Sequence, residues 1–255
     1  MPVLFAAFLV TALLYASVGF GGGSTYNALL VMSGADYRVL PAIALVCNVI
    51  VVSGGVWRFS RTGDLSLKRL LPFLAASVPA AWIGGRIPVG ETLFIGLLGG
   101  ALLLSGVHLA FQKGAETETR EPVAQSRNHR LFAAGIGGAI GLLSGIVGIG
   151  GGIFLAPVLY LMRWGRPRQI AAASSLFILV NSLSGLAGQL MKLQDLALLS
   201  LAAPYWPLPI AVLIGGQAGS WLAGYKLDPA LIRRLTALLI LYVAARLLWR
   251  WVGMI

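Results

Sequence analysis

Two glycine-rich stretches decide how this sequence can fold: Gly19-Phe20-Gly21-Gly22-Gly23 and Gly148-Ile149-Gly150-Gly151-Gly152. They interrupt the long charge-free runs 3–33 and 131–162. Because glycine costs about 1 kcal/mol relative to alanine in a helix interior, a helix should end at each stretch. Only about ten residues of each run remain after the glycines, and as a helix they reach about 15 Å, half the hydrocarbon thickness of a bilayer.

The composition assigns the chain to the membrane. Of its 255 residues, 58% are hydrophobic and 11% are charged, whereas a soluble domain carries roughly 25% charged residues. The high hydrophobicity excludes a disordered chain, and the single cysteine, Cys47, excludes a disulfide scaffold. The net charge of +11 lies mainly between the apolar runs, which is typical of membrane loops that contact anionic lipid headgroups, not of nucleic-acid binding.

The chain is predicted to be an internal duplication. When the sequence is shifted by 129 positions, the four glycines of the first stretch fall on the four glycines of the second, and Ala42 falls on Ala171. The halves are 1–112 and 130–255, and the polar segment 113–129 is predicted to be the linker between them. The charge-free runs, apart from Arg246 in the last, are 3–33, 39–57, 70–85, 92–111, 131–162, 169–191, 196–223 and 235–249.

These runs predict an all-α membrane protein in which each half holds five helical elements: a glycine-broken first helix, a short half-helix and three further spans. With sides assigned by alternation, fourteen Lys and Arg fall on one side of the membrane and five on the other, which makes the first side the cytoplasm. The linker 113–129 is then cytoplasmic and both termini are periplasmic. Because five is odd, the second half is an inverted repeat of the first, as in secondary transporters.

The glycine stretches also suggest a binding site. A helix that starts at membrane depth presents free backbone N–H groups and the positive end of its dipole, which together favour an anion, and glycine lets the ligand approach the backbone. Inverted symmetry would bring two such starts together near the midplane. Small-residue spacings elsewhere, such as Gly137–Gly141 and Gly215–Gly219, need only helix packing.

Polar residues beside the stretches complete the candidate site. Ser24, Thr25 and Asn27 follow the first stretch, while the second is followed by apolar residues and offers backbone N–H alone. Asn48 lies on the third element of the first half, and Ser174, Ser175 and Asn181 lie on its counterpart. The predicted substrate-binding residues are Gly19, Gly21, Gly22, Gly23, Ser24, Thr25, Asn27, Asn48, Gly148, Gly150, Gly151, Gly152, Ser174, Ser175 and Asn181.

The paired glycine stretches, in a duplicated chain of this length, resemble the sulfite exporter TauE/SafE family, and the resemblance covers essentially the whole chain. It implies a secondary transporter, not an enzyme, that moves small sulfur-containing anions such as sulfite or organosulfonates across a bacterial inner membrane. No cofactor or metal is expected, because every Asp and Glu lies outside the apolar runs. The sequence does not set an oligomeric state.

Export is the expected direction, because a cytoplasm about 100 mV negative drives each negative charge outward by roughly 2.3 kcal/mol without a coupling ion. Two alternatives remain. One is an uptake carrier for another small anion. The other is an intramembrane hydrolase that uses Ser144 as nucleophile and His108 as base.

Overall fold

The computed structural model describes residues 1–17, 19–111, 127–192 and 200–222, together with 229–255. In these ranges the chain is helical, which confirms the predicted all-α class. The helices are α1 (Pro2–Ser17), α2 (Gly23–Met32), α3 (Leu40–Arg61), α4 (Leu67–Arg86), α5 (Glu91–Phe111), α6 (Arg127–Val147), α7 (Gly152–Leu161), α8 (Pro167–Lys192), α10 (Pro207–Leu222) and α11 (Pro229–Val252), with a 3-10 turn at Ala203–Tyr205.

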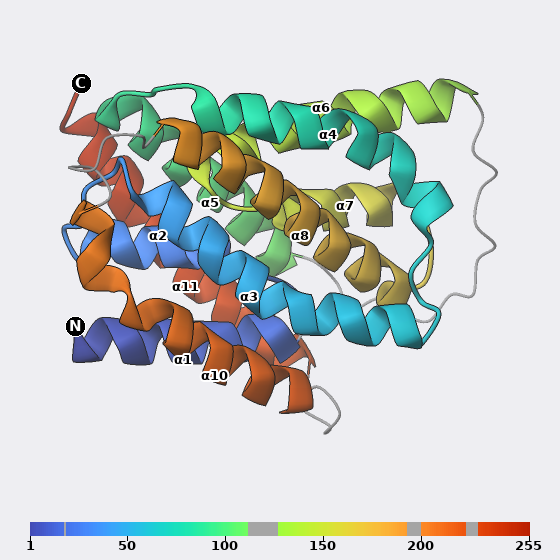
Figure 1. Cartoon of the computed structure of the whole chain (residues 1–255), viewed down its shortest axis with the longest axis horizontal. Coiled ribbons are helices and arrows are strands. Elements are labelled where there is room, and N and C mark those ends of the chain that lie inside the picture. The colour runs from blue at the N-terminus through green and yellow to red at the C-terminus, as the bar shows by residue number, and fades with distance from the viewer. Residues whose placement is uncertain (18, 112–126, 193–199, 223–228) are drawn as a thin grey trace.

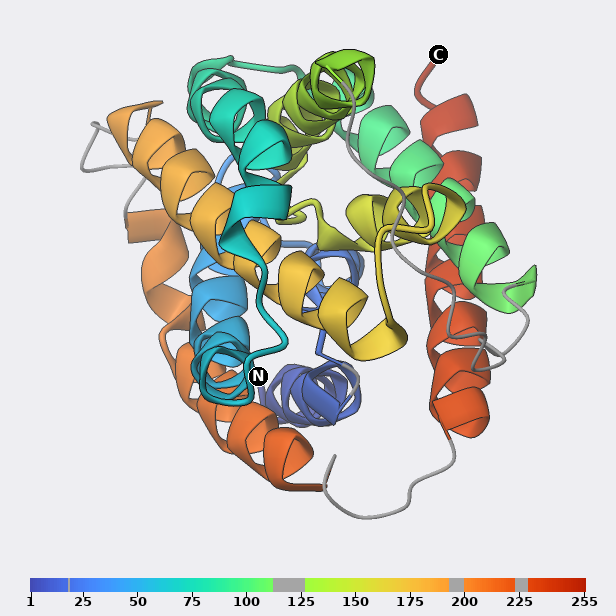
Figure 2. The same cartoon turned by 90° about the vertical axis from the view of Figure 1, so that its right-hand side faces the viewer.

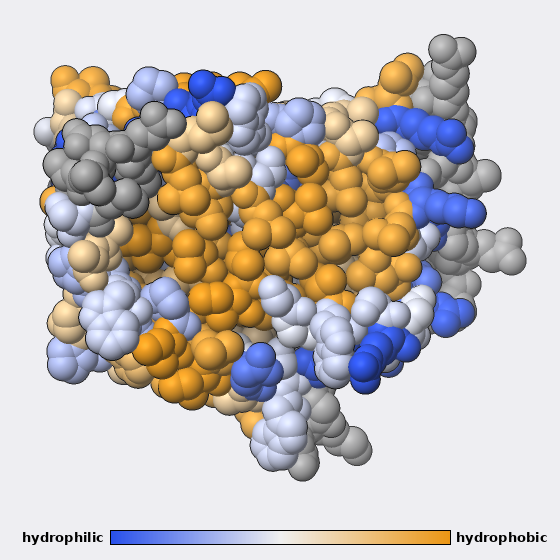
Figure 3. Space-filling view, viewed as in Figure 1, coloured by the Kyte–Doolittle hydropathy of each residue, from blue (hydrophilic) through white to orange (hydrophobic). Residues whose placement is uncertain are grey.

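Within the described ranges, four helical stretches are long and apolar enough to cross a membrane: Leu40–Arg61, Glu91–His108, Arg130–Val147 and Pro167–Lys192. Figure 3 shows their setting, a broad apolar band with hydrophilic side chains gathered mainly at one end of the molecule. The predicted run 196–223 yields a shorter helix, since α10 begins only at Pro207. Residues 200–202 are helical as well, and a 3-10 turn at Ala203–Tyr205 separates them from α10, where Pro204 and Pro207 lack a backbone N–H. Residues 113–126 of the predicted linker lie outside the described ranges, and α6 begins at Arg127.

The main helix pairs each combine one helix from the first half of the chain with one from the second half. Helix α1 lies along α10 and α6 lies along α4, so the first helix of each half packs on the fourth helix of the other. Helix α3 packs on α8, and α5 packs on α11. Figure 2 shows α2 and α7 in the interior, with the α4–α6 pair on one side and the α1–α10 pair on the other.

Glycine makes the two exchanged pairs close. A Cβ at Gly145 of α6 would lie 2.0 Å from the Ala81 carbonyl oxygen of α4, and one at Gly219 of α10 would lie 2.1 Å from the Leu13 carbonyl oxygen of α1. The spacings Gly137–Gly141 and Gly215–Gly219 are therefore packing contacts, as the sequence predicts.

Helices α2 and α7 each fold back toward the end from which their half enters the molecule. In Figure 1 both termini lie at one end, α2 returns to that end, and α6 starts from the opposite end. Each glycine stretch therefore joins the arms of a helical hairpin, an arrangement that the sequence could not distinguish from a double crossing. We call Gly19–Gly23 the first break and Gly148–Gly152 the second break.

The ends of α2 and α7 repeat the same hydrogen bonds at the same 129-residue offset. The Ala35 N–H donates to the Leu30 carbonyl, and the Trp164 N–H donates to the Leu159 carbonyl, both at 2.9–3.1 Å. The left-handed residue of this turn is Gly34 (φ 79°) in the first half and Arg163 (φ 49°) in the second. The same turn geometry thus recurs at positions 129 residues apart.

Candidate functional site

Both breaks start their helices from the same backbone conformation. The N-cap of α2 is Gly22, with φ 83° and ψ 6°, and the N-cap of α7 is Gly151, with φ 79° and ψ −13°. This left-handed region strongly favours glycine. The N–H of Tyr26 donates to the Gly22 carbonyl, and the N–H of Leu155 donates to the Gly151 carbonyl. The N–H groups before Tyr26 in α2, and those of Gly152 and Ile153 in α7, are the donors that a helix start leaves without an intrahelical acceptor. The Phe154 N–H, like that of Leu155, donates to the Gly151 carbonyl.

The two breaks meet between α3 and α8. A Cβ at Gly23 would lie 2.3 Å from Nδ2 of Asn48 and 2.8 Å from the Ile149 carbonyl oxygen. A Cβ at Gly150 would lie 2.8 Å from the same nitrogen of Asn48. On α8, Ile178 approaches Gly21, Gly150 and Gly152 alike. Asn48 and Ile178 therefore form the centre around which both helix starts are arranged.

The breaks run past each other in opposite directions. Gly19 lies against the Phe59 ring in the last turn of α3, whereas a Cβ at Gly148 would lie 2.4 Å from the Cα of Pro41 in the first turn. Between these positions both breaks approach Asn48. Each break thus extends from one end of α3 to its middle.

Three hydrogen bonds connect the halves at the breaks. The Ser175 hydroxyl of α8 donates to the Gly19 carbonyl at 2.5 Å. The Asn27 amide of α2 donates to the Val147 carbonyl at 2.7 Å, and the Asn48 amide donates to the Ile149 carbonyl at 3.0 Å. All three donating side chains are at most 1% exposed. In low-dielectric surroundings such bonds hold the backbone firmly, because losing one leaves a buried group unpaired.

Several buried polar atoms around the breaks have no partner within the described part of the chain. The Tyr26 hydroxyl lies beside Gly22, and the Ser182 hydroxyl lies beside Gly150. The Ser144 and Ser174 hydroxyls, and Oδ1 of Asn48, are unpartnered as well. Buried polar groups normally have a hydrogen-bond partner, so the unpaired hydroxyls fit a site that a ligand completes.

Every predicted polar residue of the site is buried, and the structure brings most of them to the breaks. The Thr25 hydroxyl bonds the Tyr15 hydroxyl at 2.8 Å, while the Asn181 amide bonds the Phe177 carbonyl of its own helix. Ser24 lies in the first turn of α2, and the backbone carbonyl of Ser174 approaches Gly152. The residues that are 2% exposed or less are Ser24, Thr25, Asn27, Asn48, Ser174, Ser175 and Asn181.

Sequence reasoning missed Tyr26, Ile178 and Ser182. A signal for two of them exists, since Ser175, Ile178 and Ser182 follow the i, i+3, i+7 spacing of one helix face. Tyr26 gives no such signal, because its ring stacks on Phe8 of α1 (centroids 4.7 Å apart) like an ordinary core residue.

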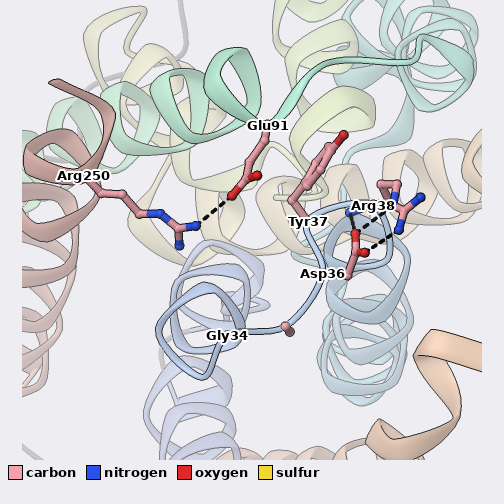
Figure 4. Close-up of a pocket in the computed structure, with 7 residues that line it drawn as sticks. Gly34, Asp36, Tyr37, Arg38, Glu91 and Arg250 are labelled. Carbon is pink, nitrogen blue, oxygen red and sulfur yellow. Dashed lines mark hydrogen bonds and ion pairs between the residues drawn. The ribbon is translucent and has the colours of Figure 1, made fainter. Parts of the chain in front are cut away.

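A second feature lies at the end of the molecule that holds the termini. A pocket of about 270 Å³ is lined by the α2–α3 loop, the start of α5 and the end of α11 (Figure 4). Arg250 pairs with Glu91 and Arg38 pairs with Asp36, at 2.7 and 2.6 Å. The hydrogen bond from the Arg38 guanidinium holds the pKa of the Asp36 carboxyl below its usual value. These charges are already paired, and they lie outside the breaks.

The residues of the hydrolase alternative are separate. The Ser144 hydroxyl and Nε2 of His108 each lack a hydrogen-bond partner in the described ranges. A serine nucleophile needs a base within hydrogen-bond reach, and no such bond joins these two side chains in the part of the chain that the structure describes.

Comparison with known proteins covers nearly the whole chain. The model of the family described as "Sulfite exporter TauE/SafE" matches residues 3–247. A relative from Sinorhizobium fredii (strain NBRC 101917 / NGR234), named "Probable membrane transporter protein y4hK", is 33% identical over 244 residues, which are 95% of this chain and 96% of the relative. No solved structure matches the chain.

Proposed function

We propose a substrate and a direction from one premise: the chain belongs to the sulfite exporter TauE/SafE family, and is therefore a multi-pass membrane transporter and not an enzyme. The proposed substrates are small sulfur-containing anions, sulfite or organosulfonates. The proposed direction is out of the cytoplasm, across the inner membrane of a bacterium. The substrate would be held where the two breaks meet.

One observation carries the proposal: two helix starts with glycine N-caps in the same left-handed conformation converge on Asn48. Backbone N–H groups and the two helix dipoles then act on one anion, with no cationic side chain needed. The unpaired hydroxyls of Tyr26 and Ser182 add donors beside Gly22 and Gly150. A sulfite or sulfonate group has three oxygens that can accept such bonds.

The absence of cationic side chains in the predicted site favours substrates of low charge. All 19 Lys and Arg lie outside the breaks and their flanking polar residues. The cost of desolvating an ion rises with the square of its charge, and only partial charges are available to offset that cost here. A monoanion such as hydrogen sulfite or a sulfonate therefore suits the site better than a dianion such as sulfate.

The proposed architecture is an inverted repeat of 1–112 and 130–255 joined by a cytoplasmic linker, 113–129, with both termini periplasmic. Support comes from the exchanged helix packing, from α1 and α6 starting at opposite ends of the molecule, and from the opposite directions of the two breaks. Fusions of alkaline phosphatase or a fluorescent protein at Ile255 test the orientation. A bright fluorescent fusion with an inactive phosphatase would overturn it.

Export needs no coupling ion, because the membrane potential drives each negative charge outward by about 2.3 kcal/mol per 100 mV. Proteoliposomes loaded with sulfite test this, with a valinomycin-set potential, negative inside, and equal pH on both sides. Efflux should accelerate with the potential, and His108→Gln should keep this response. A strong response to a pH step, with little response to potential and loss of the response in His108→Gln, would favour proton-linked exchange. Potential-insensitive uptake of sulfite would favour an importer.

A further inference from the structure

The two breaks contact opposite ends of α3. Gly19 of the first break lies against Phe59, and Gly148 of the second break lies against Pro41. Pro41 and Phe59 are about 27 Å apart along the helix axis at 1.5 Å per residue. An anion bound near Asn48 would lie between these two ends of α3. The first break lies on its path to the C-terminal end, which carries Arg61, and the second break lies on its path to the N-terminal end, which follows Arg38.

The first break is held by one side chain of the second half. The Ser175 hydroxyl donates to the Gly19 carbonyl at 2.5 Å, and Ser175 is 1% exposed. Gly19 has φ 82°, which is not a helical value, so the helical hydrogen bonds of α1 do not fix the direction of its carbonyl. Removing the hydroxyl leaves this carbonyl with one buried bond fewer.

The second break is held by two side chains of the first half: Asn48 bonds Ile149 near the centre of the site, and Asn27 holds the outer end. The Asn27 amide donates at 2.7 Å to the carbonyl of Val147, the residue immediately before Gly148. Asn27 is fully buried on α2, and the acceptor is the last residue of α6. The two residues that this bond joins are 120 positions apart in the sequence, so the bond connects the two halves directly.

Neither bond has a counterpart under the 129-residue repeat. The position equivalent to Ser175 is Val46, and the position equivalent to Asn27 is Ala156. The two bonds therefore involve separate donors, and either one can break while the other stays. Asn48 bonds Ile149 independently of both, so the centre of the site persists when one end is released.

From this geometry we propose that the breaks are two separate gates of the transporter, with Ser175 and Asn27 as positioning residues. Ser175 holds the gate at the Arg61 end and Asn27 holds the gate at the Arg38 end. The inference depends on the chain being a transporter and not on which anion it carries.

Single-cysteine labelling tests the proposal without a substrate. Cys47 is fully buried and is replaced by alanine, after which Phe20→Cys reports the first break and Ile149→Cys reports the second. A membrane-impermeant thiol reagent is added from either side of oriented vesicles. Ser175→Ala should raise the labelling rate of Phe20→Cys about fivefold, from the Arg61 side only, since one hydrogen bond is worth about a factor of five in population. Asn27→Ala should do the same for Ile149→Cys from the opposite side.

Matched controls separate gating from general loosening. Ser184→Ala removes a hydroxyl-to-carbonyl bond from α8 to Val78, and Gln189→Ala removes an amide bond to the α6 carbonyl of Gly145. Both controls should leave the two labelling rates unchanged, and Ser175→Thr, which keeps the hydroxyl, should restore the rate of Phe20→Cys. The proposal is overturned if both cysteines label from the same side, if Ser175→Ala exposes both breaks equally, or if the labelling rates do not change. Sulfite flux is measured separately, so the failure of either idea is distinguishable from failure of the other.

Discussion

At the first break Gly22 begins α2, and at the second Gly151 begins α7, with φ values of 83° and 79°. The surroundings of the two glycines differ. A Cβ at Gly22 would meet the Tyr26 ring and Thr11, whereas one at Gly151 would meet Ile140 and Phe177. Thr11 and Ile140 occupy equivalent positions of the repeat. The two glycines thus share a backbone conformation but not their neighbours, since the Tyr26 hydroxyl lies beside Gly22 while the nearest atoms to Gly151 are those of Ile140 and Phe177.

This difference assigns distinct tasks to the two breaks. The first offers side-chain hydroxyl and amide groups as well as backbone N–H groups, because Ser24, Thr25 and Asn27 lie in the first turns of α2. The second is followed on its own helix by the apolar Ile153, Phe154 and Leu155, and its neighbouring hydroxyl, that of Ser182, comes from α8. We therefore expect the backbone of both breaks to determine whether transport occurs, and the side chains of the first break to tune affinity.

The largest expected effect comes from removing what the breaks share. Gly22→Val and Gly151→Val should each abolish transport, because a β-branched residue is excluded from the left-handed region and would fill the approach to the N–H groups. Sulfite efflux from proteoliposomes measures the loss, with protein insertion checked by quantitative blotting. Near-normal efflux in both variants would place the binding site away from the breaks.

Alanine at the same positions should separate the two breaks by stability. The Cβ of Gly151→Ala would lie 2.8 Å from the Ile140 side chain and 2.9 Å from the Phe177 ring, while that of Gly22→Ala would lie 3.1 Å from the Tyr26 ring. Strain plus overpacking should cost about 2–4 kcal/mol at Gly151 and about 1–2 kcal/mol at Gly22. Thermal unfolding in detergent compares the two, and equal losses would contradict the tighter apolar surroundings of the second break.

The third prediction exchanges a side chain between equivalent positions. Ser24→Ala should weaken the apparent affinity for sulfite about fivefold, the effect of one hydrogen bond. Ile153→Ser, which introduces the same hydroxyl at the second break, should strengthen the affinity by no more than this factor. Concentration dependence of efflux measures both. No change in either variant would mean that the first turns of α2 and α7 do not contact the anion.

The turns after the short helices allow a smaller exchange. Gly34→Ala should destabilise the protein by about 1 kcal/mol, because φ is 79° there, with open space for the Cβ. Arg163→Gly, at the equivalent position with φ 49°, should stabilise it by roughly 0.5 kcal/mol, the strain relieved less the added chain entropy. Chemical or thermal unfolding measures the pair, and transport should stay within a factor of two of wild type (roughly 0.4 kcal/mol).

The smallest effect concerns pH at the same two turns. The pKa of Asp36 is lowered by its bond to Arg38, so this bond contributes stability above the unfolded value of about 3.9 and loses it as pH falls through the lower folded pKa. In the second half the Arg69 guanidinium stacks on Trp164, 4.6 Å from the ring centroid. Asp36→Asn should therefore lower Tm by less than about 2 °C at neutral pH and remove part of its acid dependence. An unchanged acid profile would argue against the Asp36 bond.

The elements most accessible to prediction were those that local chemistry decides. Clustered glycines end helices wherever they lie, so the bounds of α2 and α7 agree with the sequence to within one residue. Repeat symmetry further predicted that the breaks would meet, and they do so at Asn48. Tyr26 was missed because its role depends on which helices pack together, which leaves no local trace. Ile178 shares one helix face with Ser175 and Ser182, but that spacing does not say that the face packs on the breaks. The interruption of the run 196–223 at Ala203–Tyr205 was not predicted, because hydropathy does not register the missing N–H groups of Pro204 and Pro207.

The exchanged packing also sets the order in which this protein can be made. Helix α1 leaves the ribosome about 200 residues before the surface that receives it, around Gly215 and Gly219 of α10. At 5–20 residues per second, α1 waits on the order of ten seconds or more in the lipid before its partner arrives. The apolar side chains of α1 can face lipid during this time at little cost in free energy, because lipid tails are as apolar as the helix surface that later covers them. Neither half can be finished by itself, so tertiary assembly is completed only once the last helices have been inserted.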